Sequence, residues 1–138
     1  DTKVDDHHTV EDIGISLGRA FSEALGDRAG IARYGSFLLP MDEALVLCAL
    51  DISGRAHLEY DLTLPSQKIG TFDTELGREF FLAVARELKL TLPLKQFSGL
   101  NSHHILEAAF KGFGRAMRQA VAKSPDGRGV ASTKGVLV

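Results

Sequence analysis

The sequence has little that would cross-link the chain or hold it in a membrane. Its one cysteine, Cys48, excludes an internal disulfide and is expected to pack as a small apolar residue. No apolar run approaches the roughly 18 residues needed to span a bilayer, and no segment has the character of a secretory signal. A formal net charge of −2 at pH 7 offers no basic surface to nucleic acid. We therefore expect neither a nucleic-acid nor a membrane partner, and a cytoplasmic location.

The 138 residues are enough for one domain with a proper core. Apolar residues at helical spacing predict helices over residues 7–25, 74–88 and 103–122. Strands are predicted at 44–53, 55–64 and 91–97, the first two paired across a turn at Ser53 and Gly54. Pro93 favours an edge position or a bulge for the last strand. Residues 26–44 are predicted to form a loop-rich connection, residues 2–4 the end of a strand, and residues from 124 onward a flexible tail.

Two of the predicted helices begin with the same motif, HHxxE. An offset of 96 (103 − 7 = 96) aligns "HHTVEDIGISLGRAF" with "HHILEAAFKGFGRAM" without a gap. Over residues 7–25 and 103–121 seven residues are then identical, and these pairs are His7/His103, His8/His104, Glu11/Glu107, Gly18/Gly114, Arg19/Arg115, Ala20/Ala116 and Ala24/Ala120. Such self-similarity indicates a duplicated half-domain of strands and helices. The first copy keeps only the end of a strand, so we expect about half a repeat to precede Asp1.

The paired motifs favour a metal site. On a helix His7 and Glu11 share a face, whereas His8 points about 100° away. One motif can therefore offer a histidine and the glutamate to one ion and its other histidine to a second. Nitrogen and carboxylate ligands of this kind suit Mn, Fe, Zn or Ni, and the sequence does not choose among them. A single HHxxE would be a weak signal, because a lone histidine is most often a surface residue, but two copies in register favour metal binding.

A wider set of motifs resembles the imidazoleglycerol-phosphate dehydratase family over Asp5 to Leu137. The residues that carry the resemblance are "DDHHTVEDIGISLG", "GDRAGIARYG", "PMDEAL", "LDISGR", "NSHHILEAAFKGFGRAMRQA" and "STKG". It implies a lyase of histidine biosynthesis that dehydrates D-erythro-imidazole glycerol phosphate to imidazole acetol phosphate. It also implies two Mn²⁺ ions per active site, or other divalent transition metals, and a cytoplasmic enzyme, or a plastid one in a plant or alga.

The fold implied by the resemblance is α+β, with a duplicated half-domain like domain 2 of ribosomal protein S5 and helices packed on mixed or antiparallel sheets. Residues 1–43 would be the remainder of the first half-repeat, 44–123 the second half-repeat, and 124–138 a phosphate-binding tail. Subunits would form trimers and then a 24-subunit homo-oligomer, with metal sites at the subunit interfaces and a phosphorylated imidazole as substrate.

The resemblance also implies roles for individual residues. The metal ligands would be His7, His8, Glu11, His103, His104 and Glu107. The substrate phosphate would be bound by Arg33, Arg55, Lys111, Ser132 and Lys134, and such guanidinium, ammonium and hydroxyl groups suit a dianion. Asp42, Glu11 and Glu107 are the carboxylates expected to take part in proton transfer, with Asp42 favoured over Glu43 in "PMDEAL".

The sequence departs from the family pattern at two positions. Glu79 stands where many members have a metal-binding histidine and is a further candidate ligand, whereas Pro93 replaces a histidine. Either residues upstream complete the metal sites, or the chain is a metal-poor version. Two other functions remain open: a dinuclear-metal phosphate-ester hydrolase, and a non-catalytic subunit of a metal-assembled shell.

Overall fold

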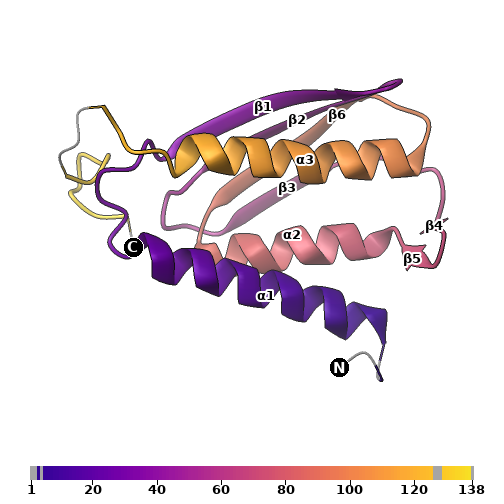
Figure 1. Cartoon of the computed structure of the whole chain (residues 1–138), viewed down its shortest axis with the longest axis horizontal. Coiled ribbons are helices and arrows are strands. Elements are labelled where there is room, and N and C mark those ends of the chain that lie inside the picture. The colour runs from indigo at the N-terminus through magenta and orange to yellow at the C-terminus, as the bar shows by residue number, and fades with distance from the viewer. Residues whose placement is uncertain (1–2, 4, 126–128, 138) are drawn as a thin grey trace.

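The computed structural model describes residue 3 and residues 5–125 and 129–137. They form an α+β fold of three helices on a mixed sheet (Figure 1). The elements, in chain order, are α1 (Asp6–Leu25), β1 (Tyr34–Met41), β2 (Ala44–Asp51), β3 (His57–Asp61), β4 (Lys68–Ile69), β5 (Phe72–Asp73), α2 (Glu75–Leu88), β6 (Thr91–Ser98) and α3 (Ser102–Ala120). None of the helices in this described part is long and apolar enough to cross a membrane.

The four-stranded sheet has the order β1-β2-β6-β3, in which β3 runs parallel to β6 and the other pairs are antiparallel. Alternate residues of β2 are buried, including Val46 and Cys48. α3 lies across β1 and β2 and closes the core on one face of the sheet (Figure 1). Gly35 permits this approach, because a Cβ there would overlap the carbonyl group of Ala116. The fold class predicted from the sequence is confirmed.

The other two helices pack on each other. α2 buries the predicted apolar stripe of Leu76, Phe80, Val84 and Leu88, and α1 packs along α2. Gly14 and Gly18 are the buried residues of α1, where a side chain would meet α2. All three helices run in the same direction, so their N-termini lie at one end of the molecule (Figure 1).

Three predictions about the strands are wrong. Residues 26–44 contain β1, whose Gly35 and Pro40 resemble loop residues but are tolerated because β1 is an edge strand. The strand predicted at 55–64 pairs with β6 and not with β2, whose two sides are occupied by β1 and β6. β6 is therefore an internal strand and not the edge strand that Pro93 favoured. The alternative, a bulge, has support, because the register of β6 with β2 shifts between Leu45–Ser98 and Val46–Gln96.

The predicted helices are confirmed. Gly26 caps α1 with φ +53°, and Asn101 caps α3 by accepting from the backbone N–H groups of His103 and His104. The predicted boundary before Ala44 falls within the hairpin of β1 and β2, which pairs Met41 with Ala44. The strand predicted at residues 2–4 lies outside the described residues.

Candidate functional site

The second histidine of the α3 motif is held by a carboxylate from another element. Glu43, in the turn between β1 and β2, places Oε2 2.7 Å from His104 Nδ1. Its Oε1 accepts from the backbone N–H groups of Leu100 (3.1 Å) and Asn101 (2.7 Å). The bond to His104, together with these amides, lowers the pKa of Glu43 to about 2. The same bond raises the pKa of His104. The charged form of Glu43 therefore fixes the ring of His104.

The second histidine of the α1 motif is held in the same way by its own N-cap. Asp5 accepts from the backbone N–H of His8 at 2.7 Å, and its Oδ1 lies 2.9 Å from His8 Nδ1. Its bonds to the backbone N–H and to the ring of His8 lower the pKa of Asp5. The hydrogen bond to Asp5 also raises the pKa of His8. In both helices Nδ1 of the second histidine is thus bonded to a carboxylate, which leaves Nε2 as the ring nitrogen on the opposite side from that carboxylate.

The first histidine of each motif faces the glutamate four residues later. His103 Nε2 lies 2.9 Å from Glu107 Oε2, and His7 Nε2 lies 3.9 Å from Glu11 Oε2. Glu107 also receives Lys111 Nζ at 2.7 Å, and this ammonium, with a smaller contribution from His103, lowers the pKa of Glu107. Each helix therefore presents an imidazole and a carboxylate side by side on one partly exposed face.

The other two candidate carboxylates differ in position. Asp42 has its Oδ2 3.5 Å from His104 Nε2 and a side chain that is 76% exposed. Glu79 lies on α2 beside Arg78, with 3.4 Å between Arg78 Nη1 and Glu79 Oε1. Among residues 5–125 and 129–137, no group of three or more His, Cys, Asp or Glu side chains is arranged to hold one metal ion.

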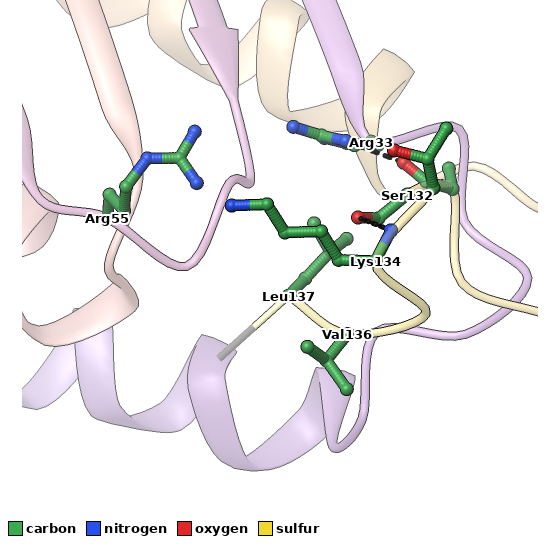
Figure 2. Close-up of a pocket in the computed structure, with 8 residues that line it drawn as sticks. Arg33, Arg55, Ser132, Lys134, Val136 and Leu137 are labelled. Carbon is green, nitrogen blue, oxygen red and sulfur yellow. Dashed lines mark hydrogen bonds between the residues drawn. The ribbon is translucent and has the colours of Figure 1, made fainter.

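A cationic pocket lies under the C-terminal tail. Four of the five predicted phosphate ligands line it, namely Arg33, Arg55, Ser132 and Lys134 (Figure 2). The side chains of Arg55 and Lys134 point toward one another across it (Figure 2). Two positive groups facing the same space repel each other, and an anion between them would relieve that repulsion. The fifth predicted ligand, Lys111, is on α3 beside Glu107 and does not line the pocket.

Arg33 has partners of its own in this pocket. Its Nε and Nη2 donate to the carboxylate of Asp51 at 2.7 and 3.1 Å, and Nη1 donates to the carbonyl of Ala131 at 2.6 Å. The hydrogen bond to Asp51 raises the pKa of Arg33. Arg33 thus joins β2 to the tail, and Arg55 and Lys134 are the other two cationic side chains that line the pocket.

The HHxxE residues and the residues of the cationic pocket lie at opposite ends of the folded molecule. The HHxxE motifs start α1 and α3 at one end, whereas Arg33, Arg55 and the tail lie near the C-terminal ends of these helices (Figure 1). Within one chain the two groups therefore do not form a common site.

Two residues of the site were not selected from the sequence. Glu43 was ranked below Asp42, yet it is Glu43 that holds the ring of His104. The sequence pattern also predicts the contact of Asp5, which was not among the selected residues. An acidic N-cap three residues before a histidine can bond that histidine, because the side chain of the cap reaches the first turn of the helix. The signal for Glu43 is absent from local spacing, since Glu43 and His104 are separated by 61 residues.

The fold and these two groups define a class: an α+β protein with a duplicated histidine–carboxylate helix and a separate cationic pocket suited to an anion. The family model described as imidazoleglycerol-phosphate dehydratase matches residues 1–117. The imidazoleglycerol-phosphate dehydratase of Desulforamulus reducens is 60% identical over 137 residues, which cover 99% of this chain and 70% of that protein. That of Synechococcus sp. strain WH7803 is 60% identical over 138 residues, with 99% and 68% covered.

Solved structures agree with these matches. The crystal structure of imidazoleglycerol-phosphate dehydratase from Staphylococcus aureus superimposes with a TM-score of 0.85 at 45% identity, over 88% of this chain and 71% of that one. The enzyme from Pyrococcus furiosus, in complex with (S)-C348, gives 0.84 at 46% identity, over 95% and 71%. The chain belongs to the imidazoleglycerol-phosphate dehydratase family. It is accordingly a hydro-lyase of histidine biosynthesis, which converts imidazole glycerol phosphate to imidazole acetol phosphate.

Proposed function

We propose that the chain performs this dehydration as a metal-dependent homo-oligomer, with divalent ions held by the HHxxE residues and the substrate phosphate held under the tail. One observation carries the proposal. His8 and His104, which occupy equivalent positions of the repeat, each have Nδ1 within 2.9 Å of a carboxylate outside the motif. Carboxylates that orient imidazoles in this way are the usual second layer of a metal site, because they fix the ring and raise its basicity.

The donor set fits a manganese ion. Imidazole nitrogens and carboxylate oxygens are ligands that Mn²⁺ accepts, as do Fe²⁺ and Zn²⁺. His8 and His104 would coordinate through Nε2, and His7 with Glu11 and His103 with Glu107 would supply the remaining donors of this chain. Glu79 stays a candidate ligand from α2. A bound metal ion would act as a Lewis acid and hold the imidazole ring of the substrate.

Substrate phosphate would bind between Arg55 and Lys134. A phosphate dianion matches a guanidinium fork, an ammonium and the hydroxyl of Ser132, which lines the same pocket. Arg33 would add one N–H while it remains paired with Asp51. Lys111 would contact the substrate phosphate from the metal-binding end of the molecule, because it lies one helical turn from Glu107.

Proton transfer would be carried out by carboxylates at the metal-binding end. Glu11 and Glu107 lie beside the first histidines, and Asp42 projects into solvent close to His104 Nε2. An exposed carboxylate within reach of a bound substrate can accept a proton from carbon, and a carboxyl group in its protonated form can deliver one to the departing hydroxyl. Since the phosphate pocket lies at the opposite end of the folded molecule, these carboxylates would contact the substrate bound to a neighbouring protomer.

The test is purification with Mn²⁺, followed by measurement of bound metal, of mass in solution and of dehydration of imidazole glycerol phosphate. The expected result is a 24-subunit assembly that loses turnover when the metal is removed by a chelator. His104→Ala should remove most of the activity and about one of the two bound metal ions, whereas the matched control His57→Ala, an exposed histidine on β3, should leave both unchanged. Release of inorganic phosphate without dehydration would favour a hydrolase, and metal-dependent assembly without turnover would favour a shell subunit.

A further inference from the structure

The loop that follows α1 is joined to the C-terminal tail by an arginine. Arg28 has a side chain that is almost fully buried, and only 3% of the residue is exposed. Its Nη1 donates to the carbonyl of Leu137 at 2.7 Å, and its Nη2 donates to the carbonyl of Leu88 at 2.9 Å. Leu88 is the last residue of α2, where helix carbonyls lack internal partners and carry partial negative charge. One guanidinium thus connects the tail to the end of α2.

The backbone around Arg28 fixes the direction of this side chain. Arg28 has φ +63°, a conformation that residues other than glycine rarely adopt. It is held there by its N–H bond to the carbonyl of Leu25 (2.9 Å) and by the bond from Ala29 N–H to Asp27 Oδ1 (2.9 Å). Burial also lowers the pKa of Arg28, which reflects the cost of removing a guanidinium from water. Arg28 thus combines a strained backbone and a desolvated guanidinium at its contact with the tail.

The same loop forms hydrogen bonds with the tail at a second place. Arg33 binds the carbonyl of Ala131, and the N–H of Gly30 donates to the carbonyl of Gly129 at 2.9 Å. The tail carbonyls at residues 131 and 137 are therefore both bound by arginines of one loop. Ser132 and Lys134 lie between these two attachment points, with Lys134 aimed at Arg55 (Figure 2). The position of Lys134 therefore depends on both attachments.

We propose that Arg28 is a positioning residue for phosphate binding: by holding Leu137 against the end of α2, it keeps the tail folded with Lys134 facing Arg55. Arg28 itself is not among the residues that line the pocket, so it would act through the tail. The inference rests on the proposed function, in which this pocket takes the phosphate of the substrate.

The test compares Arg28→Met with Arg28→Lys and with a control, Arg19→Met, which removes an exposed guanidinium from α1. Methionine keeps the apolar stem of Arg28 but removes both donors, so we expect the amides of residues 129–137 to exchange with solvent about tenfold faster. We expect KM for imidazole glycerol phosphate to rise about tenfold with kcat within about twofold, since donors to the two carbonyls are lost. Arg28→Lys, which retains an ammonium, should fall between, and Arg19→Met should match the wild type.

Two results would overturn the proposal. One is an Arg28→Met variant with unchanged KM or unchanged exchange in the tail. The other is a loss of bound metal and a lower melting temperature in both Arg28→Met and Arg28→Lys, in proportion to the rise in KM. If lysine also fails to restore KM, Arg28 has a general structural role. Lys134→Met separates this inference from the function beneath it. If Lys134→Met leaves KM unchanged, the phosphate assignment fails; if it raises KM and Arg28→Met does not, the role of Arg28 fails.

Discussion

α1 and α3 begin with the same motif but obtain its supporting carboxylate from different places. Their N-caps are equivalent, because the offset of 96 relates Asp5 to Asn101 (5 + 96 = 101). Asp5 both caps its helix and holds His8 Nδ1, whereas the amide of Asn101 only caps. On α3 the carboxylate comes instead from Glu43, in the turn before β2. The restraint on the imidazole is the same in both halves, although the residue that provides it is not.

The two helices also differ in what covers them. α3 lies on the sheet and buries residues such as Ile105 and Ala109 completely, whereas Ile13 on α1 is 54% exposed. The repeated glycines differ correspondingly. A Cβ on Gly18 would lie 2.7 Å from the Cβ of Glu87 on α2, but a Cβ on Gly114 would meet no atom within 4 Å. The position that packs tightly against α2 on α1 is therefore open on α3 at Gly114, in the described part of the chain.

The largest expected effect comes from removing the two equivalent imidazoles. We predict that His8→Ala and His104→Ala each lose about one of two bound Mn²⁺ ions and most of the activity, because metal affinity depends on each first-layer ligand. Assembly should weaken together with metal content in both variants. Elemental analysis and mass in solution measure the two quantities. Full metal content in both variants would exclude the HHxxE helices as metal sites.

A smaller effect is expected from the carboxylates that hold these rings. Glu43→Gln and Asp5→Asn keep the shape of each side chain but remove the charge, and loss of such a partner typically lowers metal affinity by about 10–100-fold. Glu43→Gln should have the larger effect, because Glu43 also accepts from the N–H groups of Leu100 and Asn101 and so fixes the start of α3.

Titration of Mn²⁺ into the metal-free variants measures the affinities, with Glu59→Gln on β3 as the control for loss of one exposed carboxylate. Equal affinity in Glu43→Gln and wild type would mean that the contact between Glu43 and His104 does not serve metal binding. Equal losses in the two variants would show that the two carboxylates are interchangeable despite their different positions.

The same comparison explains what the sequence could predict. The helices depend on spacings within 20 residues, so the sequence predicts them correctly. The partner of β3, the internal place of β6 and the bond between Glu43 and His104 depend on contacts between distant segments. The sequence does not predict β1, because Gly35 and Pro40 weaken the strand pattern. Gly35 is required where α3 approaches the strand closely, and Pro40 is tolerated because β1 is an edge strand.

Alanine at the two repeated glycines should change stability in opposite directions. Gly18→Ala forces α1 away from α2 at Glu87 and Val84, and overpacking of this kind costs about 1–3 kcal/mol. Gly114→Ala meets no atom and should stabilise α3 by about 0.5–1 kcal/mol, because glycine is a poor helix former. Urea unfolding at one protein concentration measures both. Destabilisation by Gly114→Ala would show that another segment or protomer covers this face of α3 in solution.

The smallest effects are expected at the repeated arginines, where the difference between the helices appears in the response to salt. Arg19 Nε lies 2.9 Å from Glu87 Oε2, and its side chain is 65% exposed, so Arg19→Ala should cost less than about 1 kcal/mol. Arg115 instead lies over the ring of Phe37 at 6.0 Å, a contact worth about 0.5 kcal/mol at an exposed site. Unfolding in 0.1 and 1 M NaCl distinguishes them, since salt screens an exposed ion pair and leaves the packing of an arginine stem unchanged. The Arg19→Ala effect should disappear in 1 M NaCl and the Arg115→Ala effect should persist; the same salt response in both variants would mean that α1 and α3 are held to their neighbours by the same kind of interaction.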